Sequence, residues 1–380
     1  MCENRWCYSI GIRFNVYQIE KGVVNSLYGF SFYLNDDVDQ FCDSYLSSMR
    51  EVGFSGIFTS LHIPEEDASK YRQRLADLGV LARKYHFTLM VDVSSGALAK
   101  AGFNKNPIMD LLAMGITGLR MDDGFSMEMV AEFSHQLQIG LNASTITEEE
   151  IKQLHEFAAN FSNLSAWHNY YPRPETGLER EWFARKNQWL KDNGLKVQAF
   201  ISGDDEKRGP LKVGLPTLEE HRHRLPLAAA LDLQQLGVDF VYIGDPSLSK
   251  RSQSQFQAWV KNKRLLVFCE NIKEIYRDIV LNVHHNRPDV ARDVVRSREA
   301  RGRMTNRVLP LQSLERKLGS ITIDNYFYGR YMGELQLCKV DLPMDSRVNV
   351  IGNIVQKDLS LLPFIGANIE FELIEEEVKQ

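Results

Sequence analysis

Two adjacent carboxylates, Asp122 and Asp123, follow a short strand-like run within residues 118–125. Strands place apolar residues in a core, so charged residues gather where a strand stops. If this strand belongs to a parallel barrel, its carboxyl end faces the loops from which barrel enzymes build their sites. Two carboxylates there could donate and accept protons. The structural alternative is a helix N-cap, because Asp before Gly-Phe-Ser-Met-Glu could start the next helix.

Polar side chains of different kinds also end the other predicted strands. A barrel rim that served structure alone would not need so many unlike polar groups, so they indicate a binding or catalytic site. These residues are Ser60, His62 and Glu65 near the second strand, Asp92 on the third, Arg120 beside Asp122 on the fourth, Asn142 on the fifth and Asp245 on the eighth.

Two loops add further candidates. The run at 168–177 holds hydrogen-bonding, aromatic and cationic side chains together with two prolines that fix the loop, a composition suited to binding a polar ring compound. The loop at 209–222 is longer, and such loops are commonly lids or binding loops rather than plain connections. We therefore favour a lid. The candidates in these loops are His168, Asn169, Tyr171, Arg173, Lys212, Glu219, His221 and Arg222.

The composition sets limits on partners and location. With 380 residues, 44% hydrophobic and 25% charged, the chain can bury a large core and make more than one domain. A net charge of -5 with mixed signs creates no field that would attract nucleic acid or an anionic membrane. No apolar run has membrane-spanning length, and the start lacks a signal-peptide pattern. We expect a cytoplasmic protein, and a homo-oligomer is compatible with the sequence.

The cysteines and histidines indicate neither metal nor cofactor. Five scattered cysteines without a Cys-x-x-Cys pair favour reduced thiols. The nine histidines include no His-Glu-x-x-His motif. His221 and His223 flank Arg222, which suits a solvated or substrate-facing loop better than a metal site.

A regular alternation of strands and helices begins at Leu27. Eight strand-helix units over residues 27–261 predict a (β/α)₈ barrel, with residues 1–26 as an extension outside the fold. An open doubly wound sheet is the alternative, which is weakened because no Gly-rich phosphate turn follows the first strand. The predicted strands are residues 28–34, 55–63, 88–93, 118–122, 138–142, 164–171, 195–201 and 238–243.

After Lys263 the pattern changes to strands separated by turn residues, which predicts a smaller β-rich domain at residues 262–380. Six arginines lie within residues 292–307. By default they form a solvated face, although guanidinium also binds phosphate well. The predicted strands here are residues 320–331, 333–340, 346–351 and 369–374, with a helix at 272–283.

Four segments together resemble the 6-phospho-N-acetylmuramidase family. The resemblance covers residues 27 to about 375 and implies a barrel joined to a cyclophilin-like domain. It also implies cytoplasmic cleavage of N-acetylmuramic acid 6-phosphate from N-acetylglucosamine during cell-wall recycling. The segments are Leu-Tyr-Gly-Phe-Ser-Phe-Tyr-Leu at 27–34, His-Asn-Tyr-Tyr-Pro-Arg-Pro-Glu-Thr-Gly-Leu at 168–178, Arg-Gly-Pro-Leu-Lys-Val-Gly-Leu-Pro-Thr-Leu-Glu-Glu-His-Arg at 208–222, and Gly-Ser-Ile-Thr-Ile-Asp-Asn-Tyr-Phe-Tyr-Gly-Arg-Tyr-Met-Gly-Glu-Leu-Gln at 319–336.

The acidic pair is similar to that of hexosaminidases in which the substrate's own acetamido oxygen attacks. That likeness implies that Asp122 orients the acetamido group and Asp123 acts as general acid and base, or the reverse order. Successive strand residues point to opposite faces, so both reach one site only if the chain leaves strand geometry, as Gly124 would permit. Otherwise Asp92, Glu65 or Asp245 supplies the partner.

Arg173, the loop of residues 208–222 with Arg208 at its start, or Arg330 is expected to bind the phosphate. Arg330 lies in one of the resembling segments, which suggests that the second domain closes over the barrel mouth. A non-catalytic sugar-phosphate sensor is the rival function. A lyase or aldolase would need a lysine at a strand end, and strands four to seven contain none there.

Overall fold

The computed structural model describes most of the chain. The predicted extension at residues 1–26 lies outside the described residues, as do three site candidates, His62, Glu65 and Asp123. The described residues are 27–35, 37–61, 68–94, 96, 107–122 and 124–376.

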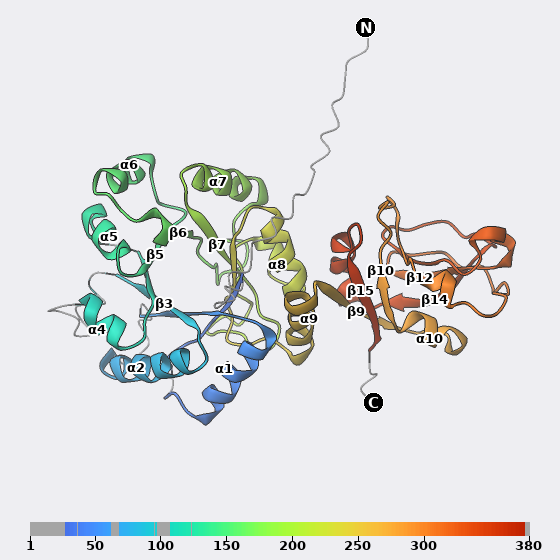
Figure 1. Cartoon of the computed structure of the whole chain (residues 1–380), viewed down its shortest axis with the longest axis horizontal. Helices are drawn as coiled ribbons and strands as arrows, with labels where there is room; N and C mark the ends of the chain where they lie inside the picture. Colours follow the sequence, from blue (N-terminus) through green and yellow to red (C-terminus); the bar gives the residue numbers. More distant parts are fainter. Residues whose placement is uncertain are drawn as a thin grey trace, which may run out of the picture.

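Eight parallel strands close into a barrel, each pairing with the next and the eighth with the first (Figure 1). The predicted (β/α)₈ barrel is thereby confirmed. The strands are β1 (Tyr28–Ser31), β2 (Gly56–Ser60), β3 (Thr88–Val93), β4 (Gly118–Met121), β5 (Gln138–Asn142), β6 (Leu164–Trp167), β7 (Lys196–Ile201) and β8 (Phe240–Ile243).

Helices surround the barrel, and their starts carry the expected capping residues. Asp39 caps α1 through the backbone N–H groups of Phe41 and Cys42, and Thr147 forms a capping box with Glu150. The helices are α1 (Gln40–Val52), α2 (Ala68–Lys84), α4 (Pro107–Ala113), α5 (Met127–Ser134), α6 (Glu148–Glu156), α7 (Arg180–Asp192), α8 (Pro226–Gln235) and α9 (Lys250–Asn262), with short 3₁₀ turns η1 (Phe161–Asn163) and η2 (Glu219–His221).

The inside of the barrel is filled by large side chains from alternate strand positions. A Cβ at Gly29 would lie 2.3 Å from Cε1 of Tyr242, so glycine on β1 makes room for that ring. Because side chains alternate along a strand, residues two positions further on point into the barrel mouth. The interior cluster is Phe58, Met90, Trp167, Phe200 and Tyr242.

A seven-stranded mixed sheet forms the second lobe, in the order β10-β15-β9-β14-β12-β13-β11. Its buried face carries Ile321, Ile323, Leu335 and Leu337. The elements are β9 (Arg264–Glu270), β10 (Val283–His285), β11 (Val294–Arg296), β12 (Ser320–Asp324), β13 (Leu335–Cys338), β14 (Val348–Ile354) and β15 (Glu370–Glu375), with η3 (Glu274–Tyr276), α10 (Arg277–Val280), α11 (Ala300–Arg303), η4 (Tyr326–Tyr331) and η5 (Gln356–Phe364).

Two secondary-structure predictions for this lobe are wrong. The strand predicted at 320–331 ends at Asp324, because the Asn325 side chain caps η4 through the Phe327 backbone N–H and Gly329 adopts a φ of 57°. The helix predicted at 272–283 is reduced to η3 and α10, and its last residue belongs to β10.

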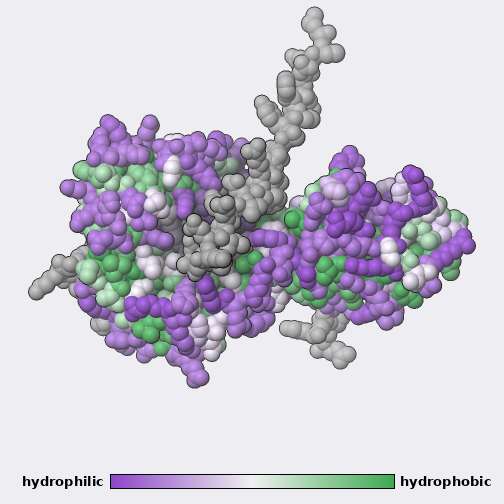
Figure 2. All heavy atoms as spheres, viewed as in Figure 1, coloured by the Kyte–Doolittle hydropathy of each residue, from purple (hydrophilic) through white to green (hydrophobic). Residues whose placement is uncertain are grey.

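Helices α8 and α9 lie between the barrel and the second lobe (Figure 1). Arg251 on α9 donates to Asp358 Oδ1 at 2.6 Å, and the Arg224 guanidinium lies 5.8 Å from the Phe364 ring centre. The surface of both lobes is largely hydrophilic on the face that Figure 2 shows. Within the described residues, none of the helices is long and apolar enough to cross a membrane.

Candidate active site

Arg120 on β4 is the centre of a hydrogen-bonded group in the barrel mouth. Its side chain is 4% exposed, and it donates to Asp92 Oδ1 at 2.6 Å and to Asn169 Oδ1 at 2.5 Å. The Ser60 hydroxyl donates to the other Asp92 oxygen at 3.1 Å. These contacts join β2, β3, β4 and the loop after β6, and both oxygens of Asp92 already accept hydrogen bonds. Asp92 is therefore held in one orientation.

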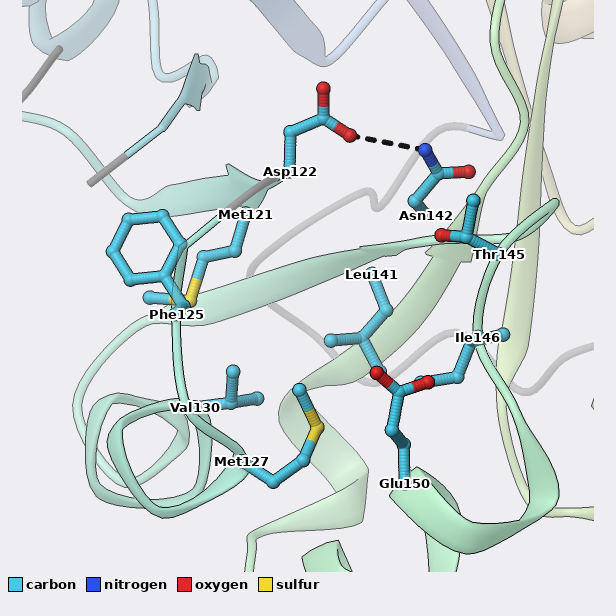
Figure 3. A pocket seen from close by; sticks show the side chains of 10 residues that line it. All are labelled: Met121, Asp122, Phe125, Met127, Val130, Leu141, Asn142, Thr145, Ile146 and Glu150. Carbon is cyan, nitrogen blue, oxygen red and sulfur yellow. Dashed lines mark hydrogen bonds between the residues drawn. The ribbon is translucent and has the colours of Figure 1, made fainter. Parts of the chain in front are cut away.

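Asp122 has a different environment, although it follows the same strand as Arg120. Its side chain is 36% exposed, and Oδ1 accepts from Asn142 Nδ2 at 3.0 Å (Figure 3). Arg120 Nη1 lies 3.9 Å from the same oxygen. Among the described residues, none donates a hydrogen bond to Oδ2 of Asp122. One carboxylate oxygen is thus available to a ligand while the other fixes the group.

The helix-cap alternative does not account for Asp122. The N-cap of α5 is Ser126, whose hydroxyl accepts from the Met129 backbone N–H at 3.2 Å. Asp122 lies four residues before that cap and is directed toward Asn142 instead. Asp122 therefore does not cap helix α5.

A small hollow lies beside the Asp122–Asn142 pair, between the ends of β4 and β5 and the starts of α5 and α6 (Figure 3). Glu150 reaches this hollow, but its Oε2 accepts from the backbone and hydroxyl of Thr147. Its carboxylate therefore belongs to the helix cap. The remaining lining is mostly apolar: Met121, Phe125, Met127, Val130, Leu141 and Ile146.

Aromatic residues and a cation line the other side of the mouth. The Tyr33 hydroxyl donates to the Gly244 carbonyl at 2.5 Å, and the Arg208 guanidinium carbon lies 3.5 Å from the Tyr33 ring centre. Burial raises the pKa of Tyr33 well above its ordinary value, and burial also raises the pKa of Tyr170. The Tyr170 ring packs edge-on against Phe200 of β7, with the ring centres 5.2 Å apart.

Arg222 locks the loops after β6 and β7 together. It is 4% exposed and donates to the carbonyls of Tyr171 and Gly214 at 3.0 Å and of Arg173 at 3.3 Å. It also forms a two-pronged ion pair with Glu219. Hydrogen bonding from Arg222 lowers the pKa of Glu219 to about 2. Most donors of Arg222 are thus used to hold the rim.

Three other predicted residues are buried and bonded to the scaffold. His168 Nε2 contacts Asn187 Oδ1 on α7 at 2.7 Å, and burial lowers its pKa to about 4. His221 Nε2 contacts Asp232 Oδ2 at 2.7 Å. Asp245 accepts from the backbone N–H groups of Gly203, Arg208 and Leu215 at 3.0 to 3.2 Å. The structure does not bring these side chains to Asp122.

Glu220, His221 and Asp232 lie close enough to surround a cation. Two guanidinium groups, those of Arg180 and Arg224, already contact Asp232. These positive charges balance the carboxylates and would repel a metal ion. The donor set therefore fits an internal ion-pair network better than a metal centre.

The remaining cations lie apart from this group. Arg173 is exposed, and only its backbone takes part in the contacts described above. Arg330 is exposed in the second lobe, where it donates to the Tyr331 hydroxyl at 2.8 Å. Tyr33 was not among the sequence candidates. Counting the strand alternation past the end of β1 would have placed it at the mouth.

Sequence models of one family match both lobes. The "6-phospho-N-acetylmuramidase, N-terminal" model matches residues 28–258, and the "6-phospho-N-acetylmuramidase, C-terminal" model matches residues 265–374. The chain belongs to the 6-phospho-N-acetylmuramidase family. The family resemblance in the sequence is thus confirmed.

Two solved structures share the whole arrangement of this 6-phospho-N-acetylmuramidase family member. A conserved Enterococcus faecalis protein of unknown function is 46% identical with a TM-score of 0.86, and the match covers 92% of this chain and 97% of that one. An uncharacterized B. cereus protein is 27% identical with a TM-score of 0.71, covering 92% and 99%. None of the curated proteins matches the chain.

Proposed function

We propose that this protein is a cytoplasmic glycoside hydrolase that cleaves N-acetylmuramic acid 6-phosphate from N-acetylglucosamine in cell-wall recycling. Family membership supports the reaction class. The observation that carries the proposal is the carboxylate of Asp122, tethered by Asn142 through one oxygen and open on the other in a barrel mouth. A group so placed suits contact with a polar substrate.

The proposed mechanism is substrate-assisted. The acetamido oxygen of the muramic residue attacks its own anomeric carbon while the bond to the leaving oxygen breaks. Asp122 accepts a hydrogen bond from the acetamido N–H and holds that group in line. Asp123 gives a proton to the leaving oxygen, which departs as a hydroxyl of N-acetylglucosamine. Asp123 then takes a proton from water, whose oxygen attacks the anomeric carbon and restores the acetamido group.

Neighbouring residues have supporting roles in this proposal. Asp92 is held by Arg120 and Ser60, so we assign it to orienting rather than to proton transfer. The apolar hollow beside Asp122 suits a methyl group of the substrate. Other sequence candidates for substrate contacts stay predictions: His62, Glu65, Asn142, Asn169, Tyr171 and Arg173.

The test is turnover of the phosphorylated disaccharide by the full chain and by Asp122→Asn. We expect hydrolysis by the native protein and a loss of ~10²-fold or more in the variant, because an essential carboxylate contributes about that factor. Asp192→Asn is the matched control, since Asp192 is exposed at the end of α7. Its turnover should equal that of the native protein.

Two outcomes would contradict the proposal. Near-native turnover in Asp122→Asn would remove Asp122 from the chemistry. Tight binding of an unchanged disaccharide by the native protein would favour the sugar-phosphate sensor instead.

A further inference from the structure

The cations of the barrel mouth differ in how many of their donors are already used. Arg120 donates to Asp92 and Asn169, and Arg222 donates to three carbonyls and Glu219. Lys207 donates to the Gly203 carbonyl and lies 3.6 Å from Asp245. Each of these cations is committed to the protein itself.

Arg208 is the exception. Its backbone N–H is fixed by Asp245, but its guanidinium donates no hydrogen bond to any residue in the described part of the chain. Its Nη1 is fully buried and unpartnered. A buried donor without an acceptor costs free energy, and an anion would remove that cost. The Arg208 side chain is therefore prepared for a ligand that the protein does not supply.

The surroundings of Arg208 suit an anion. The Tyr33 ring supports one face of the guanidinium, so the N–H donors in the plane of the fork do not point into that ring. Tyr33 and Tyr170 stay neutral because burial raises the pKa of both hydroxyls, so they add no negative charge. Three acids come just before Arg208: Asp204 accepts from Ser249 and Ser252, Asp205 accepts from Ser247, and Glu206 is exposed.

The position of Arg208 in the barrel also suits an anion site. Arg208 follows β7, and Tyr33 contacts Gly244 just after β8. Barrel enzymes frequently bind phosphate through the loops after these two strands. We propose that the Arg208 guanidinium, supported by Tyr33 and beside Tyr170, binds the 6-phosphate of the substrate. This inference rests on the proposed function and names the group that recognises the phosphate.

The assignment also orients the sugar. Arg208 follows β7 and stacks on Tyr33 just after β1, whereas Asp122 follows β4 on the opposite side of the closed eight-stranded barrel. The phosphate end then lies toward β7 and β8 and the anomeric carbon toward Asp122 after β4. One pyranose ring would lie across the mouth between them.

The experiment compares Arg208→Gln, which keeps a polar stem over Tyr33, with Lys196→Ala. Lys196 is exposed at the start of β7, at the other end of that strand, so its replacement removes one positive charge away from the mouth. Calorimetry measures binding of N-acetylmuramic acid 6-phosphate and of unphosphorylated N-acetylmuramic acid. Arg208→Gln should weaken binding of the phosphorylated sugar about 10- to 100-fold, the usual size of a lost contact with a charged group. Lys196→Ala should not.

Hydrolysis of the disaccharide with and without its phosphate separates this inference from the proposed function. Hydrolysis with equal losses for both substrates in Arg208→Gln would overturn the phosphate assignment and leave the hydrolase standing. Arg208-dependent binding without hydrolysis would support the phosphate site and overturn the hydrolase. No preference of the native protein for the phosphorylated sugar would overturn the phosphate site directly. Arg208→Lys, which keeps the charge but not the fork, should retain part of the binding.

Discussion

Arg222 and Arg208 lie in the same long loop after β7, yet the regions around them are opposites. Around Arg222, two loops meet and the guanidinium is used by carbonyls and Glu219. Around Arg208, the guanidinium stacks on Tyr33 and none of the described residues accepts from it. The same residue type therefore stabilises the fold in one place and is left for a ligand in the other. The two arginines differ in whether their guanidinium donors find acceptors within the protein.

The Asp122 region extends this comparison to carboxylates. Asp92 has both oxygens occupied by Arg120 and Ser60, whereas Asp122 keeps one oxygen open. We expect substitution of a side chain whose polar atoms are all paired within the protein to reduce mainly stability. Substitution of a side chain that keeps an unpaired polar atom should reduce mainly ligand binding or turnover.

The largest stability effect is expected for Arg222→Ala. Removing one partner of a buried ion pair typically costs about 3–5 kcal/mol, because the other groups are left unpaired. Here Glu219 and three carbonyls would lose their donor. Thermal unfolding should show a midpoint several degrees lower than that of the native chain.

Arg173→Ala is the control for stability, since that side chain is exposed at the same rim. Its unfolding free energy should change by less than about 0.5 kcal/mol. Equal unfolding midpoints for Arg222→Ala and Arg173→Ala would contradict the claim that the hydrogen bonds of Arg222 stabilise the rim.

An intermediate effect is expected for Asp324 in the second lobe. This carboxyl is 4% exposed, and burial together with Glu334 and Asp345 raises its pKa to about 7. In the unfolded chain its pKa is near the ordinary 3.8. Folding therefore favours the protonated form of Asp324. The stability that this protonated carboxyl contributes is fully present below about pH 4, and it is lost as the pH rises toward 7.

Asp324→Asn should accordingly stabilise the second lobe at pH 8 by on the order of 2 kcal/mol, allowing for solvent screening, and by much less at pH 4. Asp345 offers a control of opposite sign, because hydrogen bonding from Arg347 lowers its pKa to about 2. Asp345→Asn should destabilise at pH 8. Thermal unfolding midpoints of both variants at pH 4 and pH 8 test this. A lower midpoint for Asp324→Asn or a higher one for Asp345→Asn at pH 8 would contradict the prediction.

The smallest effect is expected for Asn142→Ala, which removes the hydrogen bond that positions Asp122. Losing one neutral-to-charged hydrogen bond corresponds to about a tenfold change. We expect kcat to fall by about that factor with little change in KM. In an Asp122→Asn background the same substitution should cause no further loss. Additive losses would show that Asn142 acts independently of Asp122.

Much of the barrel was predictable because its signals are local. Strand β5 occurs at residues 138–142 as expected, and the capping pattern at Thr147 starts α6. Strand β6 ends at Trp167 rather than at residue 171, because the following residues form the loop that Arg222 holds. β9 was missed because it follows α9 without a long turn.

The site was predictable only as a set of rim residues. Strand ends identified Asp92, Arg120, Asp122 and Asn142, and the structure brings these four together. His168, His221 and Asp245 look equally suitable in sequence, yet each is bonded to the scaffold. The roles of Asp123, His62 and Glu65 stay predictions.

The sequence by itself determined the repeating strand-helix pattern, the second β-rich lobe and the family, because these follow from spacing and from short motifs along the chain. Only the tertiary structure decided which polar groups remain free. Arg208 and Arg222 are 14 residues apart in one loop, and no local pattern distinguishes them. They contact residues in the loops after β1, β6 and β8, so packing between distant segments decides whether each guanidinium finds acceptors.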